Sequence, residues 1–297
     1  MEYISAKTIV TKTKSNSWFG NDYNMNIYKG CCHGCIYCDS RSDCYRISDF
    51  DRVRAKENAL EIIRNDLRRK VKKGVIGTGS MSDPYNPFEE ELCLTGHALE
   101  LVDAFEFGIS IATKGTILAR DIDILESIRE HSPVLVKITI TTADDAKALM
   151  IEPGAPPSSE RFALLKKLNQ SGIMAGILLM PILPFVNDDE ENIFRILKLA
   201  AESGARFIYP GFGVTLRMNQ RIHYYEQLKK LFPEQDLPKR YNSVYGNRYS
   251  CNIPDSRKLY ERFTAECAKH DILYDMKDII HAYKRNYGEG QLSLFDF

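Results

Sequence analysis

Three cysteines in one short segment constrain this chain more than any other feature. Cys31, Cys35 and Cys38 follow the spacing CxxxCxxC. A loop with this spacing can turn three thiolates towards one centre, and thiolates are soft ligands that suit iron–sulfur clusters or zinc. A four-iron cluster needs four ligands, so these cysteines would leave one iron open to a ligand that is not protein.

Two other interpretations of this loop stay open at this point. The cysteines are either buried side chains without a ligand, or part of a zinc knuckle with His33 or Cys32 as the fourth ligand. Three further cysteines are isolated in the sequence and receive no ligand role: Cys44, Cys251 and Cys267. Eight cysteines, three of them in a ligand spacing, favour a reducing compartment over a disulfide framework.

The composition is that of a soluble globular protein. The chain has 297 residues, of which 44% are hydrophobic and 27% charged, so it is long enough for one large core. The formal net charge is zero, so any surface that attracts nucleic acid must be local. The first residues lack the apolar core of a signal peptide, and no apolar run approaches membrane-spanning length. We therefore expect a cytoplasmic protein.

Strand patterns and helix patterns alternate along the chain. Strands are expected at 25–28, 75–77, 109–112, 134–141, 173–180 and 207–209, and helices at 59–71, 98–105, 122–131, 158–169 and 188–203. Thr95 is the expected cap of the second helix, and Ser158 or Ser159 that of the fourth. Six such units predict parallel strands with right-handed crossovers, which fit an open, partial (β/α)6 TIM-type barrel.

The first predicted helix has an apolar face and a basic face. Leu60, Ile63, Leu67 and Val71 recur at helical spacing and are expected to be buried together. The basic side chains are Arg64, Arg68, Arg69, Lys70, Lys72 and Lys73. They form either a solvated helix face, which we prefer, or a contact with phosphate groups.

Several short polar or glycine-containing segments follow the predicted strands. In TIM-type barrels the chemistry lies at the C-terminal ends of the strands. The segments concerned are the cysteine loop, 77–83, 113–114, 139–142, 180–184 and 210–213. We expect them to converge on one mouth of the barrel.

The segment Tyr28–Cys38 resembles the cluster loop of radical S-adenosylmethionine (SAM) enzymes, and more narrowly that of the spore photoproduct lyase-like branch. The resemblance implies that Cys31, Cys35 and Cys38 hold a [4Fe–4S] cluster, and that Tyr37 within the loop contacts SAM. In that superfamily SAM chelates the open iron through its amino and carboxylate groups. An electron from the cluster then cleaves SAM and releases a 5′-deoxyadenosyl radical.

Later strand ends resemble the same family. Gly77–Tyr85 is similar to the segment beside the methionyl part of SAM, which implies contacts from Gly79 and Ser80. Lys114 matches a lysine that pairs with the SAM carboxylate, and Thr139 a position that contacts the ribose. Taken alone, these residues would be a turn, a surface charge and a buried strand threonine. Glu152–Pro156, followed by Arg161, also matches, without an assigned role.

Two positions depart from the family pattern. Asp39 stands where the family often has tyrosine. In the segment Gly79–Ser82 the chain has no thiol, although spore photoproduct lyases place a hydrogen-donating cysteine there. The serine O–H bond is too strong to replace it, and Cys93, the nearest other thiol, is expected in the core. We therefore expect poor turnover of the spore photoproduct thymine dimer.

We divide the chain into a radical SAM core barrel at 20–216, a helical C-terminal extension at 217–285 and a flexible tail at 286–297. In the extension, Tyr224, Leu228 and Leu231 have helical spacing and are expected to pack on the barrel. Basic and aromatic residues alternate between Arg240 and Tyr249. They either pack on the barrel, which we prefer, or stack on bases.

The tail contains a short apolar peptide after two glycines. Its sequence is Gln291, Leu292, Ser293, Leu294 and Phe295. It resembles the peptide with which bacterial replication and repair proteins bind the DNA sliding clamp. The alternative is a hydrophobic tail that folds back on its own domain.

The sequence as a whole predicts a radical SAM enzyme that uses a [4Fe–4S] cluster and SAM and acts on damaged or modified DNA, in a lyase-like DNA repair reaction. A flavodoxin or ferredoxin is the expected electron donor. A lesion in duplex DNA would have to leave the base stack to reach the barrel mouth. The alternatives are a radical SAM enzyme with a non-DNA substrate, and a non-catalytic zinc-binding adaptor of the replication machinery.

Overall fold

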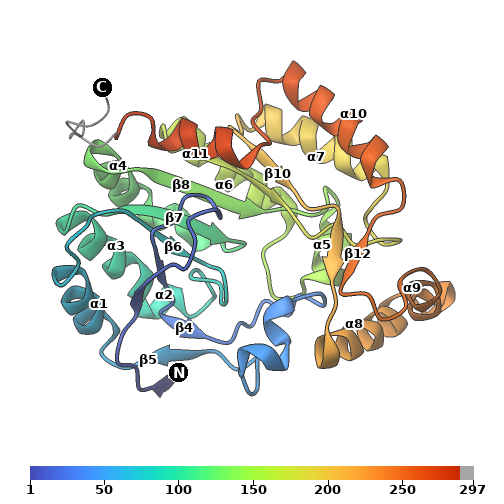
Figure 1. The fold of residues 1–297 in the computed structure, drawn as a ribbon, viewed down its shortest axis with the longest axis horizontal. Helices are drawn as coiled ribbons and strands as arrows, with labels where there is room; N and C mark the ends of the chain where they lie inside the picture. Colours follow the sequence, from blue (N-terminus) through green and yellow to red (C-terminus); the bar gives the residue numbers. More distant parts are fainter. Residues whose placement is uncertain (288–297) are drawn as a thin grey trace.

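The computed structural model describes residues 1–287 and has an α/β fold built on one seven-stranded sheet (Figure 1). The strands, in spatial order, are β10 (Ile208–Pro210), β9 (Ala175–Leu179), β8 (Val134–Thr139), β7 (Gly108–Thr113), β6 (Val75–Thr78), β3 (Tyr23–Met25) and β2 (Val10–Lys12). All neighbours from β3 to β10 are parallel, and only the edge strand β2 is antiparallel in this sheet. The parallel strands form the predicted partial TIM-type barrel.

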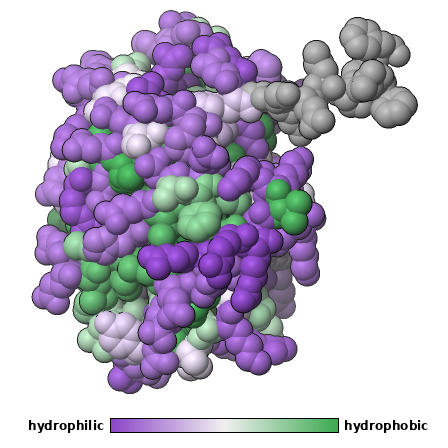
Figure 2. Space-filling view, turned by 90° about the vertical axis from the view of Figure 1, so that its left-hand side faces the viewer, coloured by the Kyte–Doolittle hydropathy of each residue, from purple (hydrophilic) through white to green (hydrophobic). Residues whose placement is uncertain are grey.

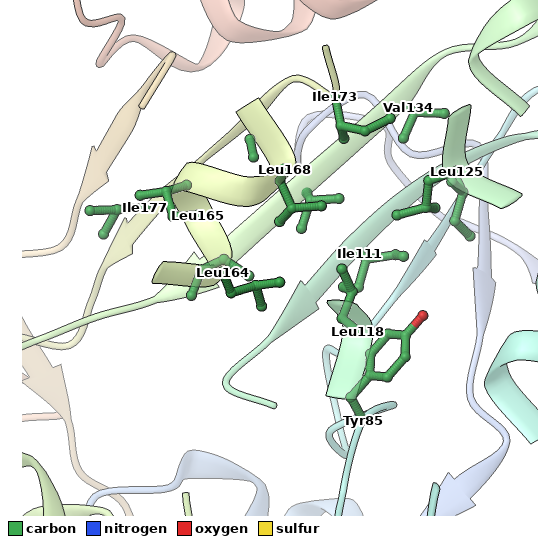
Figure 3. Close-up of a cluster of buried hydrophobic side chains, with 14 of the residues drawn as sticks. Tyr85, Ile111, Leu118, Leu125, Val134, Leu164, Leu165, Leu168, Ile173 and Ile177 are labelled. Atoms are coloured by element: carbon green, nitrogen blue, oxygen red, sulfur yellow. The ribbon is translucent and has the colours of Figure 1, made fainter. Parts of the chain in front are cut away.

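Helices cover the outer face of the sheet. They are α1 (Ala59–Arg68), α2 (Glu89–Leu92), α3 (Leu94–Ala104), α4 (Ile122–His131), α5 (Asp145–Ile151), α6 (Ser158–Gln170) and α7 (Glu190–Glu202). Figure 3 shows part of the core between sheet and helices, where Ile111 and Ile177 lie near Leu125 of α4 and Leu165 of α6. These side chains are fully buried, so removal of their apolar surface from water stabilises this packing.

Several local predictions were wrong. The strand predicted at 25–28 is divided, because β4 (Tyr28–Lys29) pairs with β5 (Arg54–Lys56) in a separate sheet that also contains β1 (Glu2–Ile4). Helix α1 ends at Arg68, so Val71 lies beyond it and is exposed. The short helices α2 and α5 were not predicted.

The predicted helix caps were also wrong. Thr95 lies inside α3, where its hydroxyl donates to the Pro84 carbonyl over 2.7 Å. Ser158 and Ser159 lie inside α6, and Pro157 is the N-cap. At both places the side chain that is suited to capping lies inside the helix and makes its contacts elsewhere. The reason is that the helix begins earlier than the local pattern suggests.

The basic residues of the first helix lie on a polar side of the molecule. Figure 2 shows mainly hydrophilic side chains on the side that carries α1, α3 and α4, with small separate hydrophobic areas. Arg64, Arg68 and Arg69 are exposed there, as expected for a solvated helix face.

After the last barrel strand the chain is mostly helical. The elements are β11 (Gly213–Thr215), α8 (Met218–Leu231), α9 (Leu237–Tyr245), β12 (Ser250–Asn252), α10 (Ser256–Lys269) and α11 (Met276–Lys284). Strands β11 and β12 form an antiparallel pair, and α10 packs on α7. Short 3-10 turns occur at Asp39–Arg41, Asp43–Tyr45, Thr116–Asp121 and Pro233–Gln235. The domain boundaries at 216 and 285 remain predictions.

The aromatic residues of the extension mostly pack against one another and against the barrel. Tyr224 and Leu228 of α8 are fully buried, as predicted, and Leu231 is partly buried beside them. Tyr241 and Tyr245 are also buried, and they lie on helix α9 rather than on a loop. Packing therefore accounts for these two tyrosines, whereas Tyr249 is exposed.

Helix α11 returns to the barrel and covers its N-terminal end (Figure 1). Phe19, Leu135, Phe207 and Tyr283 are buried in one cluster there, and the Tyr283 hydroxyl donates to the Phe19 carbonyl over 2.6 Å. Within residues 1–287, no helix combines the length and the apolar character needed to cross a membrane.

Candidate functional site

A cavity of about 320 Å³ lies at the C-terminal ends of the barrel strands. Its lining contains every residue predicted for the site: Cys31, Cys35, Tyr37, Cys38, Gly79, Ser80, Lys114 and Thr139. A cavity of about 430 Å³, near Arg206 and Arg285, contains none of them. The strand ends therefore converge as a TIM-type barrel requires, at the position where such barrels hold ligands.

Backbone hydrogen bonds hold the cysteine loop on both sides. The Cys31 amide donates to the Phe50 carbonyl over 2.8 Å, and the Ile36 amide donates to the Ile151 carbonyl over 3.0 Å. Gly30 begins the loop with φ +82°, and a Cβ there would lie 2.6 Å from the Arg52 carbonyl oxygen. The loop is therefore fixed by the surrounding chain before any ligand is considered.

The three thiols lie in a low-dielectric environment. Cys35 is buried, and Cys31 and Cys38 are half-buried. Burial raises the pKa of all three thiols, to about 12 for Cys31. Thiolates at these positions need a positive partner, and a bound iron centre would provide it. The donor set therefore fits a metal cluster.

The geometry fits a zinc knuckle less well. The His33 side chain is buried and turned towards Asp83, with 3.3 Å between Nδ1 and Oδ2. Cys32 packs against the main core. In the described part of the chain, no three Cys, His, Asp or Glu side chains converge as the ligands of a single metal ion. A multi-iron cluster does not need that convergence, because each cysteine binds a different iron.

Asp83 connects three of the predicted segments, and sequence reasoning assigned it no role. Its carboxylate accepts hydrogen bonds from the Thr113 hydroxyl and from the Lys114 amide, the latter over 2.8 Å, and it faces His33. Burial opposes its ionisation, but His33 and these donors hold its pKa well below the usual range. The sequence signal for this role was an aspartate directly after Ser82 in the segment Gly77–Tyr85.

Gly79 must be glycine. Its φ is +91°, and a Cβ would lie only 1.8 Å from the Ala112 carbonyl oxygen of β7. No side chain fits there without moving the backbone, so glycine keeps β6 and β7 close together at the cavity. Ser80, which follows it, is exposed at the mouth. The adjacent Ser82 hydroxyl donates to the Gly30 carbonyl over 2.7 Å.

Lys114 and Tyr37 lie next to each other in the cavity. The Lys114 Nζ is 5.7 Å from the centroid of the Tyr37 ring. Burial acts to lower the pKa of Lys114, but the negative charge of Cys35 and Glu152 raises it above its ordinary value. The ammonium group is therefore charged at neutral pH, which suits a carboxylate ligand.

Glu152 and Arg161 form a buried ion pair behind the cysteine loop. Both side chains are 0% exposed, and 2.5 Å separates Arg161 Nη1 from Glu152 Oε2. The Tyr37 hydroxyl donates to Glu152, and Arg161 Nη1 donates to the Thr139 carbonyl over 3.0 Å. Burial opposes ionisation of Glu152, but Arg161 and Lys114 keep its pKa below the ordinary value. The pair links Tyr37 to Thr139, which gives a structural role to residues that the sequence left without one.

Helix α8 contacts the other side of the same loop, and sequence reasoning missed these contacts. The Gln220 amide group donates to the Tyr37 carbonyl over 3.0 Å. Arg217 donates to both carboxylate oxygens of Asp39 over 3.0 Å. Asp39, the residue that departs from the family pattern, is therefore the anchor between the loop and α8.

A buried lysine lies in the barrel interior below Thr139. Lys137 precedes Thr139 by two residues in β8, so both side chains point to the same face of the sheet. It is 1% exposed, donates to the Ser110 hydroxyl and lies 4.7 Å from the Phe19 ring centroid. Burial lowers its pKa to about 7. A single lysine in an otherwise apolar strand was the signal in the sequence.

The family model of the radical SAM superfamily matches residues 25–197 of this chain. The chain belongs to the radical SAM superfamily. An uncharacterized protein of Mycobacterium tuberculosis is 28% identical over 281 residues, which cover 92% of this chain and 81% of that protein. An uncharacterized protein of Methanocaldococcus jannaschii is 33% identical over 190 residues, which cover 63% of this chain and 69% of that protein.

A solved structure has a similar fold. It is a spore photoproduct lyase variant with bound AdoMet and dinucleoside spore photoproduct, with a TM-score of 0.63 and 13% identity, covering 95% of this chain and 79% of that chain. The predicted radical SAM family and the barrel fold are thus confirmed. Membership implies SAM and an iron–sulfur cluster as cofactors.

Proposed function

We propose that this radical SAM protein acts on damaged or modified DNA. The single observation that carries the proposal is the cavity in which the three cysteines meet Lys114, Thr139 and Gly79 at the strand ends. The nucleic acid part of the proposal is supported by the similar fold of a lyase that binds a dinucleoside photoproduct.

In this proposal Cys31, Cys35 and Cys38 hold a [4Fe–4S] cluster, and SAM occupies the adjoining cavity. When bound, the cluster and SAM together supply the electron and the 5′-deoxyadenosyl radical with which the reaction begins. The protein itself binds and orients these groups.

Each predicted SAM contact has a distinct task. The Lys114 ammonium pairs with the SAM carboxylate, and the absent side chain of Gly79 lets the backbone approach the methionyl group. Ser80 contributes a hydroxyl at the mouth, and the Thr139 hydroxyl holds the ribose. The Tyr37 ring lies beside Lys114, and its orientation is fixed by its hydrogen bond to Glu152.

The apolar part of the lining protects reactive groups. Leu178, Met180 and Val214 also line the cavity. Apolar walls exclude water and competing hydrogen-bond partners, which limits side reactions of a radical.

The hydrogen donor of spore photoproduct lyases has no counterpart in this proposal. The cysteines in the cavity lining are the three assigned to the cluster. Cys93 lies at a different surface hollow, where Arg120 Nη1 is 3.3 Å from its sulfur. We therefore expect poor conversion of the spore photoproduct thymine dimer. Clean conversion to two thymines would show that another residue donates the hydrogen.

The proposed partners are an electron donor, a flavodoxin or ferredoxin, and the bacterial sliding clamp. The clamp peptide, Gln291 to Phe295, lies outside the described residues. A peptide spanning 288–297 is expected to bind the clamp with roughly micromolar affinity. Replacing Leu294 and Phe295 by alanine should abolish that binding.

We place the enzyme in the cytoplasm, where a reducing environment keeps the cysteines available.

An anaerobic labelling experiment tests the function. The protein is reconstituted, reduced and supplied with SAM and ultraviolet-damaged DNA deuterated in the bases. Formation of 5′-deoxyadenosine that carries deuterium from the DNA is the expected result, and Cys35→Ala should abolish it. Deuterium transfer from a small molecule and never from DNA would support the non-DNA alternative. Colourless protein with stoichiometric zinc would support the adaptor.

A further inference from the structure

An exposed tryptophan and a half-buried tyrosine lie together at the edge of the barrel. Trp18 is 41% exposed, and its ring centroid is 5.5 Å from Tyr209 and 5.0 Å from Phe19. Tyr209 belongs to β10, the last strand of the sheet, and its register partner is Leu178 of β9. Leu178 lines the cavity, so Tyr209 is next to the cavity wall.

One hydrophobic cluster connects the cavity lining with Tyr209. Met180 lines the cavity and packs in the same hydrophobic cluster as Phe19 and Tyr209. Gly211 after β10 approaches Met180 so closely that a Cβ would lie 2.7 Å from the Met180 Cβ. The cavity lining and Tyr209 therefore share one hydrophobic cluster, and the Trp18 ring contacts Tyr209.

Helix α11, which covers the N-terminal end of the barrel, carries a basic hollow that adjoins Gly20. The hollow has a volume of about 410 Å³ and is lined by Lys277, Ile280, His281, Lys284 and Arg285. Its position is fixed relative to Trp18, because Lys284 donates to the Gly20 carbonyl and the Phe19 amide lies 3.2 Å from the Met276 sulfur.

Acidic groups also lie nearby, but outside the hollow. Asp22 is 3.8 Å from the Lys284 Nζ, Asp275 is the N-cap of α11, and Asp278 lies in its first turn. None of these carboxylates is part of the hollow's lining, which is basic and apolar. The arrangement therefore offers positive charge at one place and aromatic surface beside it.

The basic residues just after α1 differ from those of α11 in what they contact. There, Lys70 and Lys73 lie over the rings of Tyr23 and Phe107, which are themselves buried. Those cations cover aromatic rings of the protein's own core. At α11 the Lys284 side chain contacts Gly20, two residues after Trp18, and the Trp18 side chain is 41% exposed.

We propose that Trp18 and Tyr209 stack on an unpaired base of a single-stranded or locally opened DNA segment, while the α11 hollow binds the phosphates that flank it. The inference rests on the proposed function, because it names the DNA form that this site takes. Aromatic side chains beside a positively charged groove are the usual means of binding single strands without reading sequence. Tyr209 next to the cavity then directs the following nucleotide towards SAM.

Tryptophan fluorescence tests the proposal directly, because Trp18 is the only tryptophan in the chain. The reconstituted protein with SAM is titrated anaerobically with an oligothymidylate of about ten nucleotides. We expect saturable quenching of the emission, with the same Kd as the anisotropy of a labelled oligonucleotide. This measurement on the unaltered chain needs no variant that must fold.

Variants give the second line of the test. Trp18→Ala should weaken oligothymidylate binding by about 5- to 100-fold, since alanine substitution of a stacking residue removes about 1–3 kcal/mol. Tyr3→Ala is the matched control, because Tyr3 is 49% exposed but lies on β1 in a separate sheet. Lys277→Gln should reduce the slope of log Kd against log salt concentration by about one, as expected for the loss of one phosphate contact. Arg64→Gln on α1 should leave this slope unchanged.

The outcomes separate this inference from the proposed function. DNA binding with unchanged Trp18 emission, or a Trp18→Ala variant that binds as tightly as the Tyr3→Ala control, would overturn the stacking surface while DNA remained the substrate. Equal quenching by single-stranded DNA and by intact duplex would overturn the requirement for an unpaired base. Failure to bind any DNA, with SAM cleavage intact, would overturn both proposals.

Discussion

Two arginine–carboxylate pairs hold the cysteine loop from opposite sides, and they differ mainly in burial. On the barrel side, Glu152 and Arg161 are 0% exposed and contact the loop through the Tyr37 hydroxyl. On the side of α8, Arg217 and Asp39 are each 30% exposed. The two pairs involve the same chemical groups within a few residues of the same cysteines.

Burial decides how much each pair contributes. Removing one partner of a buried pair leaves an unpaired charge in a low dielectric and typically costs about 3–5 kcal/mol. A solvent-exposed pair contributes about 1 kcal/mol or less, because water screens it. We infer that the barrel side sets the position of the loop together with the fold, and that the α8 side adds a weaker restraint.

Breaking the buried pair should therefore have the largest effect. Arg161→Met is expected to lower the free energy of unfolding by about 3–5 kcal/mol, because Glu152 loses its partner. Urea denaturation of the reconstituted protein measures the change. The double variant Glu152→Gln with Arg161→Met is the control, and it should recover part of the loss. A single variant as stable as the unaltered chain would contradict the assigned role.

The pH dependence of stability has the same origin. The pKa of Glu152 is lower in the folded protein than in the unfolded chain, so its contribution is present above the ordinary glutamate pKa. It should be lost as the pH falls through the lower folded-state value. Denaturation midpoints between neutral and acidic pH should therefore fall more steeply for the unaltered chain than for the double variant.

Gly79→Ala should have the next largest effect and lower the free energy of unfolding by about 3 kcal/mol. The reason is that left-handed strain of about 1–2 kcal/mol adds to the collision with Ala112. It should also weaken SAM binding, measured by equilibrium dialysis. Gly246→Ala is the matched control, since φ is +53° there and a Cβ would meet nothing within 4 Å. Equal losses for the two variants would show that the approach of β6 to β7 is not the critical constraint.

On the α8 side, Gln220→Ala should cost about 1–3 kcal/mol, because it leaves the buried Tyr37 carbonyl without its donor. The loop should then release iron faster in air, which the decay of the cluster absorbance measures. Ile222→Ala on the exposed face of α8 is the control. Identical decay rates for both variants would remove α8 from the support of the loop.

Asp39→Asn should have the smallest effect, about 1 kcal/mol or less. Raising the ionic strength should reduce the difference between this variant and the unaltered chain, because the pair is exposed to solvent. If instead Asp39→Asn destabilised the protein as strongly as Arg161→Met, burial would not be what distinguishes the two sides.

The same comparison explains which parts of the molecule the sequence could predict. The strand ends and the cysteine loop were predicted because alternating apolar patterns and a short ligand spacing are local signals. The contact between Gln220 and Tyr37 joins residues 183 positions apart, and no local pattern marks it. Glu152 and Arg161 were noticed in the sequence, but their pairing and the hydrogen bond from Tyr37 depend on how α6 packs beside the loop.

We propose that the cavity at the strand ends binds an iron–sulfur cluster on three cysteines together with SAM. Electron paramagnetic resonance of the reduced, reconstituted protein, recorded with and without SAM, tests it most directly. We expect about four irons per chain and a cluster spectrum that changes when SAM is added, and Lys114→Ala should need more SAM for the same change. Stoichiometric zinc in place of iron, or a cluster spectrum that SAM does not alter, would contradict it.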